Sequence, residues 1–345
     1  MRRILILIFV IFVIAVLCTA ATGWWIHSEL RTPYYGAEEP ETFVEIIPDT
    51  SSGGIASLLV RHRILRHRLP FLIYARLTHS SRRLQAGEYR FASPMSPIQI
   101  VQRLLRGDVY FQSITIPEGL DSREVIERLI KNGLGKKADF ERVMARTEWI
   151  RDLAPAARNL EGFLFPDTFR FRRKVLPEEI VKTMVNQFRI QWAKLLATHP
   201  LPEGWDVTRI VTLASIIEKE AGAAEERPLV ASVLVNRLRR GIPLAVDPTI
   251  IYALKLSSRF DGNLRKSDLS LNSPYNTYLR AGLPPGPIAN PGIDSLTAAL
   301  VPARSSYVYY VSKNDGTHQF SKDYQSHLNA VAKYQKTLTR RRTGS

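Results

Sequence analysis

The chain has 345 residues, with 48 Lys and Arg against 32 Asp and Glu, so its formal net charge is +16. A hydrophobic content of 45% excludes a disordered protein, and this length can bury a core across two or three modules. The single Cys excludes a disulfide framework and a cysteine-built zinc site. The positive charge predicts an anionic partner: nucleic acid, anionic lipid or an acidic polymer.

The N-terminus predicts a membrane anchor. An uncharged apolar run covers residues 4–22, preceded by Arg2 and Arg3 and followed by Trp24 and Trp25. About 20 helical residues cross a hydrocarbon core of about 30 Å, and basic residues favour the cytoplasmic side while Trp favours the interface. The alternative is a cleaved signal peptide, whose apolar region is usually only about 7–15 residues long.

This pattern predicts the location of the protein. We expect a cytoplasmic tail at 1–3, a single-pass transmembrane helix at 4–25 in the cytoplasmic (inner) membrane, and an extracytoplasmic body. Nucleic acid is then not a partner, and the available anionic polymers are the cell-wall glycan, with its acidic stem peptides, and lipid headgroups.

A polar linker at 26–40 leads to a first module at 41–112. Periodicity and capping residues predict its elements in this order: a strand at 43–47, a helix at 54–60, a turn and strand at 84–91 and a helix at 96–105. The basic segment 61–68 (RHRILRHR) is interpreted as a helix face, either solvated surface or a binding patch.

A second module is expected at 113–340, with its core at 205–335. Its predicted elements are a strand at 113–116, helices at 122–130, 177–196, 206–221 and 228–238, a strand at 307–311 and a closing helix at 323–338. Residues 243–293 are rich in Pro, Gly, Asn and Ser and are expected to be irregular, which in a compact domain usually indicates function. The fold class is α+β, with a small αβ module before a larger catalytic domain.

Two acids on an apolar helix are the strongest chemical feature. Glu218 and Glu220 in LASIIEKEA point about 200° apart, so they cannot act as a pair, and one is expected to face inward and the other outward. The helix neighbours of Glu220 are bulky and apolar, whereas those of Glu218 are smaller. Burial raises the pKa of a carboxyl group, as a general acid requires. The alternative is that Glu220 pairs with an Arg, such as Arg227 or Arg237.

The irregular segment carries neutral hydrogen-bonding groups suited to a sugar polymer, although a plain rigid loop has the same composition. No Gly-rich phosphate loop, HExxH or GxSxG motif is present, and the seven His residues lack metal-ligand spacing. These enzyme classes are therefore set aside, and no metal site is expected.

Seven ordered motifs resemble the endolytic murein transglycosylase (YceG-like, MltG) family. They are LQAGEYRF, LEGFLFPDTF, LASIIEKEAG, ASVLVNRL, VDPTIIYAL, SPYNTYLRAGLPPGPIANPG and HQFSKDYQSHLNAV. The resemblance covers residues 41–335 and the anchor, and the first module is similar to that family's LysM-like subdomain.

The resemblance implies non-hydrolytic cleavage of the β-1,4 bond between N-acetylmuramic acid and N-acetylglucosamine, which leaves 1,6-anhydro-muramyl ends and needs neither a metal nor an organic cofactor. It also implies that this cleavage terminates new strands near peptidoglycan synthases. The family's catalytic acid falls on Glu220, with Glu218 in reserve as a catalytic or supporting carboxylate. The residues expected to line the substrate cleft are Arg237, Asp247, Thr249, Tyr252, Asn272, Ser273, Tyr275, Asn276, Thr277, Pro284, Pro285, Gly286 and Asn290.

Two other functions fit the same residues. One is a hydrolytic muramidase that uses Glu220 with Asp247, and the other is a non-catalytic glycan-binding scaffold for wall synthases. The products distinguish them, because an anhydro end is lighter than a hydrolysed end by one water molecule and a scaffold yields neither.

Overall fold

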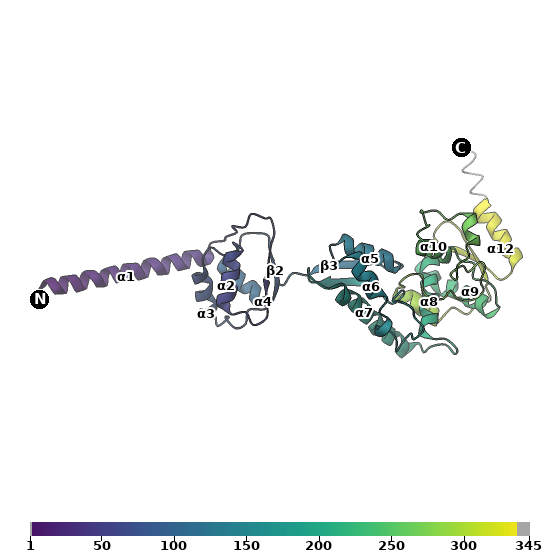
Figure 1. The fold of residues 1–345 in the computed structure, drawn as a ribbon, viewed down its shortest axis with the longest axis horizontal. Coiled ribbons are helices and arrows are strands. Elements are labelled where there is room, and N and C mark those ends of the chain that lie inside the picture. Colours follow the sequence, from purple (N-terminus) through teal and green to yellow (C-terminus); the bar gives the residue numbers. More distant parts are fainter. Residues whose placement is uncertain (1, 337–345) are drawn as a thin grey trace, which may run out of the picture. The chain divides into compact units, whose positions relative to one another are not determined.

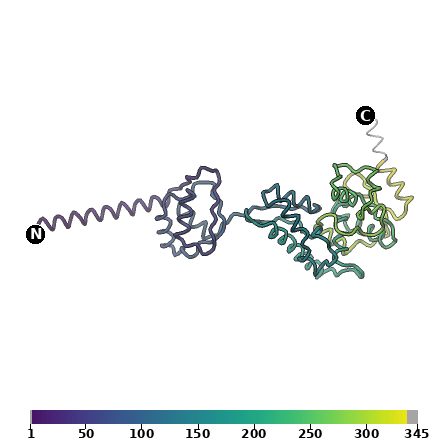
Figure 2. Tube along the Cα trace, in the orientation of Figure 1, coloured from purple at the N-terminus to yellow at the C-terminus, as the bar shows by residue number. Residues whose placement is uncertain are grey.

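A computed structural model describes residues 2–336 and shows a mixed α+β protein (Figures 1 and 2). The contacts divide the chain into two compact units, residues 1–112 and residues 113–345. Each unit has its own buried hydrophobic core. The α+β class predicted from the sequence is confirmed.

The first unit begins with a long apolar helix. Helix α1 (Arg2–Arg31) contains the run 4–22 and continues through both Trp residues as one uninterrupted helix. Its apolar side chains are exposed, and it is the one helix within residues 2–336 that is long and apolar enough to cross a membrane. The predicted linker therefore starts later than residue 26, because the helix ends at Arg31.

The body of the first unit packs three helices around a two-stranded sheet. Strands β1 (Thr42–Ile46) and β2 (Gly87–Phe91) are antiparallel, with Val44 opposite Tyr89. The helices are α2 (Ser52–Arg61), α3 (Arg68–Leu77) and α4 (Pro97–Arg106). Ser96 caps α4 through a capping box with Gln99, and Gly107 ends it in the left-handed conformation.

The basic segment 61–68 was expected to form a helix face, and this prediction is wrong. Arg61 ends α2, Arg68 starts α3, and a turn joins them, with Arg63 in the left-handed region at φ 56°. The turn buries Ile64 and Leu65 in the core and leaves its Arg side chains outside. The periodicity of the basic residues hid this turn and the whole of α3.

The second unit is mainly helical. Its strands are β3 (Gln112–Ile116) paired with β4 (Asp167–Phe171), and β5 (Tyr309–Ser312) antiparallel to β6 (His318–Ser321). Its helices are α5 (Ser122–Lys131), α6 (Lys137–Met144), α7 (Pro177–Thr198), α8 (Val207–Glu220), α9 (Arg227–Arg239), α10 (Asp247–Leu256), α11 (Ile293–Leu300) and α12 (Tyr324–Val331). Helix α8 packs against α9, α10 and α11 and so lies at the centre of this unit.

Two expectations for the last third were wrong in part. The segment 243–293 is not wholly irregular, because Pro248 lies in the first turn of a regular helix, α10. The closing helix is α12 followed by a π-helical turn at Ala332–Lys336; the predicted end at residue 338 lies outside the described residues.

Close backbone packing holds the chain after α8 against the β5–β6 turn. A Cβ on Gly222 would lie 2.7 Å from the carbonyl oxygen of Gly316, closer than real Cβ contacts. The absence of a side chain at position 222 therefore lets the hairpin approach the end of the helix that carries both acids.

Candidate active site

Glu220 is the last residue of α8, at the point where the helix opens into an extended Ala221. Asp206 caps the other end of the helix by accepting a hydrogen bond from the Arg209 amide at 2.8 Å. Between these ends, Leu213, Ile216 and Ile217 are completely buried. The apolar helix therefore fixes Glu220 at the edge of the core rather than on a mobile loop.

The Glu220 side chain faces a cleft of about 380 Å³. The cleft is lined by Glu220, Arg237, Leu244, Ala245, Val246, Asp247, Tyr278, Tyr309, Tyr310, Tyr324 and His327. Helix ends, the segment before α10 and the strand β5 all contribute to it. Residues far apart in the sequence thus converge on one carboxyl group.

One hydrogen bond orients the carboxyl group: the Tyr310 hydroxyl donates to Oε2 of Glu220 at 2.6 Å. Burial raises the pKa of Tyr310 well above its ordinary value, so this hydroxyl keeps its proton. The His318 ring lies edge-on to Tyr310 with centroids 5.4 Å apart, and Glu226 lies 2.7 Å from Nδ1 of His318. These contacts hold the Tyr310 ring in position against Glu220.

Burial raises the pKa of Glu220 above its ordinary value of 4.5, and the negative charge of Asp247 acts in the same direction. The hydrogen bond from Tyr310 and the charges of His318 and Arg237 oppose this shift. The carboxyl end of α8 also disfavours a negative charge at this position. Glu220 is thus a carboxyl group suited to holding a proton at the pH where an ordinary Glu has lost it.

Asp247 is the second acid of the cleft, and its Oδ1 accepts a hydrogen bond from the Tyr278 hydroxyl at 2.5 Å. Arg237 lines the same cleft, but its guanidinium donates to the carbonyl oxygens of Val308 and Leu244, both at 2.6 Å. Arg237 therefore ties β5 to the segment before α10.

Glu218 lies in different surroundings. Its side chain is only 4% exposed and contacts Arg227 at 3.3 Å, while its Oε2 accepts the Gly292 amide at 2.9 Å. The prediction that one of the two acids faces outward is wrong, because Glu218 is turned into this ion pair. The alternative that Arg227 pairs with Glu220 is not what the structure shows, since Arg227 contacts Glu218, Glu118 and Asp294.

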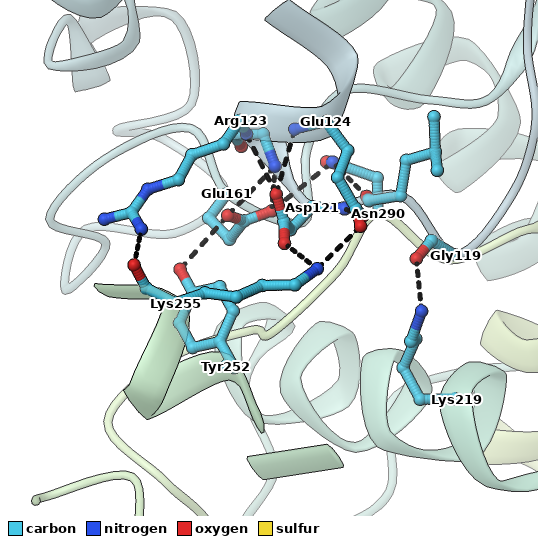
Figure 3. A network of polar contacts seen from close by, with 11 residues as sticks. Gly119, Asp121, Arg123, Glu124, Glu161, Lys219, Tyr252, Lys255 and Asn290 are labelled. Carbon is cyan, nitrogen blue, oxygen red and sulfur yellow. Dashed lines mark hydrogen bonds and ion pairs between the residues drawn. The ribbon is translucent and has the colours of Figure 1, made fainter. Parts of the chain in front are cut away.

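Two further expected cleft residues lie in a second polar centre around Glu161 (Figure 3). Tyr252 donates to Oε2 of this buried Glu at 3.1 Å, and the Asn290 amide donates to Oε1 at 3.3 Å. The Ser122 amide also reaches both oxygens, at 3.1 and 3.2 Å. Burial, together with the charge of Asp121, raises the pKa of Glu161 to about 7.

The other expected cleft residues are mostly engaged within the protein. The Thr249 and Thr277 hydroxyls lie 2.8 Å apart and are buried, and the Asn276 amide donates to the Leu269 and Leu271 carbonyls. The Ser273 hydroxyl accepts the Tyr275 amide, and Asn272 is exposed and accepts from Arg280. Pro284 and Gly286 are buried, and Pro285 is exposed.

The aromatic residues that line the cleft were not predicted from the sequence: Tyr278, Tyr309, Tyr310, Tyr324 and His327. Four of the five lie in the segments YVYYV and HQFSKDYQSHLNAV, which were noted only as a strand and as a family motif. The Tyr309 ring stacks on His327 with centroids 5.0 Å apart, and the Arg237 guanidinium lies 5.2 Å from the centre of the Tyr309 ring. The only signal in the sequence was the Tyr-rich composition of these segments.

Within residues 2–336, no group of three or more His, Cys, Asp or Glu side chains is arranged to hold a metal ion.

Comparisons with known proteins agree on one family. The model of the YceG-like family matches residues 44–333. An endolytic murein transglycosylase from Bacillus subtilis is 32% identical over 317 residues, covering 86% of each chain. One from Streptococcus pneumoniae is 25% identical, over 81% of this chain and 56% of its own length. A solved yceG-like protein from Listeria monocytogenes superposes with a TM-score of 0.56 at 30% identity, covering 84% of this chain and 98% of the other.

Proposed function

The chain belongs to the YceG-like family, and on that basis we propose that it is a peptidoglycan lytic transglycosylase with Glu220 as its catalytic acid. The single observation that carries the assignment is a half-buried carboxyl group of raised pKa that opens into a cleft of about 380 Å³. Relatives named endolytic murein transglycosylases support the enzyme class and the glycan substrate.

In the proposed reaction, protonated Glu220 gives its proton to the glycosidic oxygen between N-acetylmuramic acid and N-acetylglucosamine. The bond from that oxygen to C1 of the muramyl residue breaks, and the oxygen leaves as a hydroxyl group. The Glu220 carboxylate then takes the proton of the muramyl 6-hydroxyl, whose oxygen bonds to C1. The acid is regenerated, no water is consumed and the new end is 1,6-anhydro-muramyl.

The surroundings of Glu220 suit both halves of this cycle. Burial stabilises the protonated form that starts the reaction, while the Tyr310 hydrogen bond stabilises the carboxylate that forms in the middle. Asp247 and its partner Tyr278 lie in the same cleft, where the negative charge of Asp247 can stabilise positive charge developing at C1. Tyr309 and His327 offer flat surfaces for a sugar ring.

Cleavage within new strands would terminate their elongation, and we propose that this occurs beside peptidoglycan synthases. Helix α1 is proposed to span the cytoplasmic membrane with its N-terminus inside, and the body of the first unit to act as a LysM-like glycan-binding module. A reporter at the C-terminus that is active only in the cytoplasm would overturn this topology.

Digestion of purified glycan in water enriched in ¹⁸O tests the chemistry. A lytic transglycosylase yields anhydro ends without ¹⁸O, whereas a muramidase using Glu220 with Asp247 yields reducing ends that carry it. Unchanged glycan alongside tight binding would instead identify a scaffold. A Glu220→Gln variant is the control for contaminating activity.

A further inference from the structure

One strongly charged surface of the first unit has no role in the proposed reaction. Between Thr50 and Gly87 the sequence has no Asp or Glu, but it has seven Arg: Arg61, Arg63, Arg66, Arg68, Arg76, Arg82 and Arg83. Helix α3 adds two exposed apolar side chains to this surface, Leu69 at 50% and Leu77 at 73% exposure. Exposed apolar groups beside basic groups on one helix are typical of a surface that lies in a membrane interface.

A groove of about 690 Å³ runs along the same helix. Its lining combines apolar Leu69, Leu72 and Ile73 with basic Arg76 and Arg82. Acyl chains meet phosphate groups at the boundary of a bilayer, so the lining has the two kinds of side chain that such a boundary requires.

Two contacts fix the depth of this surface relative to α1. The Trp25 ring lies 5.4 Å from the His67 ring, and Arg66 lies 3.8 Å from the Glu29 carboxylate. Helix α3 packs directly against α1, beside its C-terminal end (Figure 1). Since α1 is a single helix to Arg31, the turn and α3 are held at the level of Trp25 and Glu29.

That level is the headgroup layer. The apolar run ends at residue 22, so a rise of about 1.5 Å per residue places Trp25 about 5 Å and Glu29 about 10 Å beyond it. The polar layer of a bilayer is about 5–8 Å thick on each side of the hydrocarbon core. Trp25 and its contact His67 therefore lie within this layer, where lipid phosphates are found, and Glu29 with its contact Arg66 lies just outside it.

We propose that turn 62–67 and α3 form a docking face for the anionic phospholipid headgroups of the leaflet from which α1 emerges. Leu69 and Leu77 enter the acyl boundary, and Arg68 and Arg76 contact the phosphates, while Arg66 stays paired with Glu29. The inference rests on the proposed anchoring by α1. The basic segment then serves to hold the module flat on the membrane, which limits how far from the bilayer the catalytic unit can reach.

The experiment uses the full chain in lipid nanodiscs, with Cys18→Ala to remove the single native thiol. A nitroxide is attached at Leu69→Cys, or at Ile47→Cys, which is a matched apolar site with 63% exposure at the end of β1. Collision of each nitroxide with oxygen and with a water-soluble nickel chelate is measured in discs of phosphatidylcholine alone and in discs containing phosphatidylglycerol. Resistance to alkaline extraction reports whether α1 is inserted.

We expect the label at position 69 to be shielded from nickel and exposed to oxygen in the anionic discs, while the label at position 47 stays accessible to nickel. High salt should reverse the shielding. Arg68→Gln with Arg76→Gln should lower the ratio of docked to undocked module about tenfold or more, since each basic residue near an anionic surface contributes about fivefold. The control variant Arg90→Gln with Arg106→Gln removes two positive charges elsewhere on the first unit and should leave the ratio of docked to undocked module unchanged.

Equal nickel access at positions 69 and 47, with α1 inserted, would overturn the docking face and leave the anchor standing. Equal shielding in discs without phosphatidylglycerol would overturn the role of anionic lipid. Shielding that appears only when soluble glycan is added would show that this face binds glycan instead. Failure of α1 to insert would contradict the docking face and the anchor together.

Discussion

In the second unit, burial raises the pKa of both Glu161 and Glu220, and the environments of these two carboxyl groups differ in one decisive respect. Glu161 accepts hydrogen bonds from Ser122, Tyr252 and Asn290, and these occupy both of its oxygens. Glu220 accepts one side-chain hydrogen bond, from Tyr310, and its cleft is open to a substrate. Burial alone therefore does not distinguish the proposed catalytic acid. What distinguishes Glu220 is that its carboxyl oxygens still have free hydrogen-bonding positions.

The Glu161 centre has a structural role that reaches the acid-bearing helix. Asn290 also accepts the Gly162 and Leu164 amides and donates to the Leu120 carbonyl, while Lys219 donates to the Gly119 carbonyl at 3.0 Å (Figure 3). The loop before α5, the loop at 162–164, the segment that contains Asn290 and the end of α8 are thereby joined. The Glu161 centre thus holds these loops together, whereas the Glu220 carboxyl group is accessible to a substrate in its cleft.

The largest effect is expected for Glu220→Gln. The amide keeps the size of the side chain and can still accept from Tyr310, but it cannot donate the proton, so the rate should fall about 10²–10⁴-fold. The measurement is the release of anhydro ends, with far-UV circular dichroism and glycan binding as controls for folding. Wild-type turnover in this variant would remove Glu220 from the mechanism.

Glu161 should instead control stability. Its folded pKa of about 7 is above its ordinary value of 4.5, so the folded protein holds a proton that the unfolded chain has released between these pH values. Stability should therefore fall by about 3 kcal/mol as pH rises from 4.5 to 7 and level off above. In Glu161→Gln this contribution should be lost, and the contribution of Glu220, whose pKa is also raised, should remain. Denaturant unfolding followed by the fluorescence of buried Trp192 measures both proteins, and an identical pH dependence would contradict the assignment.

A smaller effect is expected at the neighbouring acid. Glu218→Gln removes the charge facing Arg227, which keeps Glu118 and Asp294 as partners, so unfolding should become easier by about 1–2 kcal/mol. Its oxygen can still accept the Gly292 amide. Turnover should remain close to that of the wild type; a loss as large as that of Glu220→Gln would show that the two acids have exchanged roles.

The smallest effect is expected for Tyr310→Phe, as a shift in the pH dependence of kcat/KM. The mechanism needs protonated Glu220, so kcat/KM falls as pH rises through the pKa of that group in the free enzyme. Tyr310→Phe removes a hydrogen bond that stabilises the carboxylate, so the pKa should rise and the alkaline limb should move to higher pH by about one unit. A limb that moves to lower pH would contradict this role for Tyr310.

The sequence predicted the elements whose pattern is local. The apolar run, the capped α4 and the helix α8 with Glu220 near its end follow from composition, Ser96 and periodicity. Helix α10 was missed because Asp247 and Pro248 look like a turn, although Pro is well tolerated in the first turn of a helix. The turn after α2 was missed because its left-handed residue is Arg63 rather than Gly.

The candidate site was harder to predict because its walls come from distant segments. Tyr310 is 90 residues from Glu220, and no local pattern links them. The Glu161 centre was missed for the same reason, since its donors lie on three separate segments. Hydrogen-bonding residue types identified the region, but only the fold separates those that line the cleft from those that brace the loops.

Titration of the two carboxyl groups is the most direct test of the comparison. In ¹³C-Glu-labelled protein, the carboxyl signals of Glu220 and Glu161 would be assigned by their loss in Glu220→Gln and in Glu161→Gln. A soluble glycan fragment should then change the titration of Glu220 and leave that of Glu161 unaltered. A Glu220 signal that titrates at the ordinary value of 4.5, or a glycan response at Glu161 instead, would contradict the account.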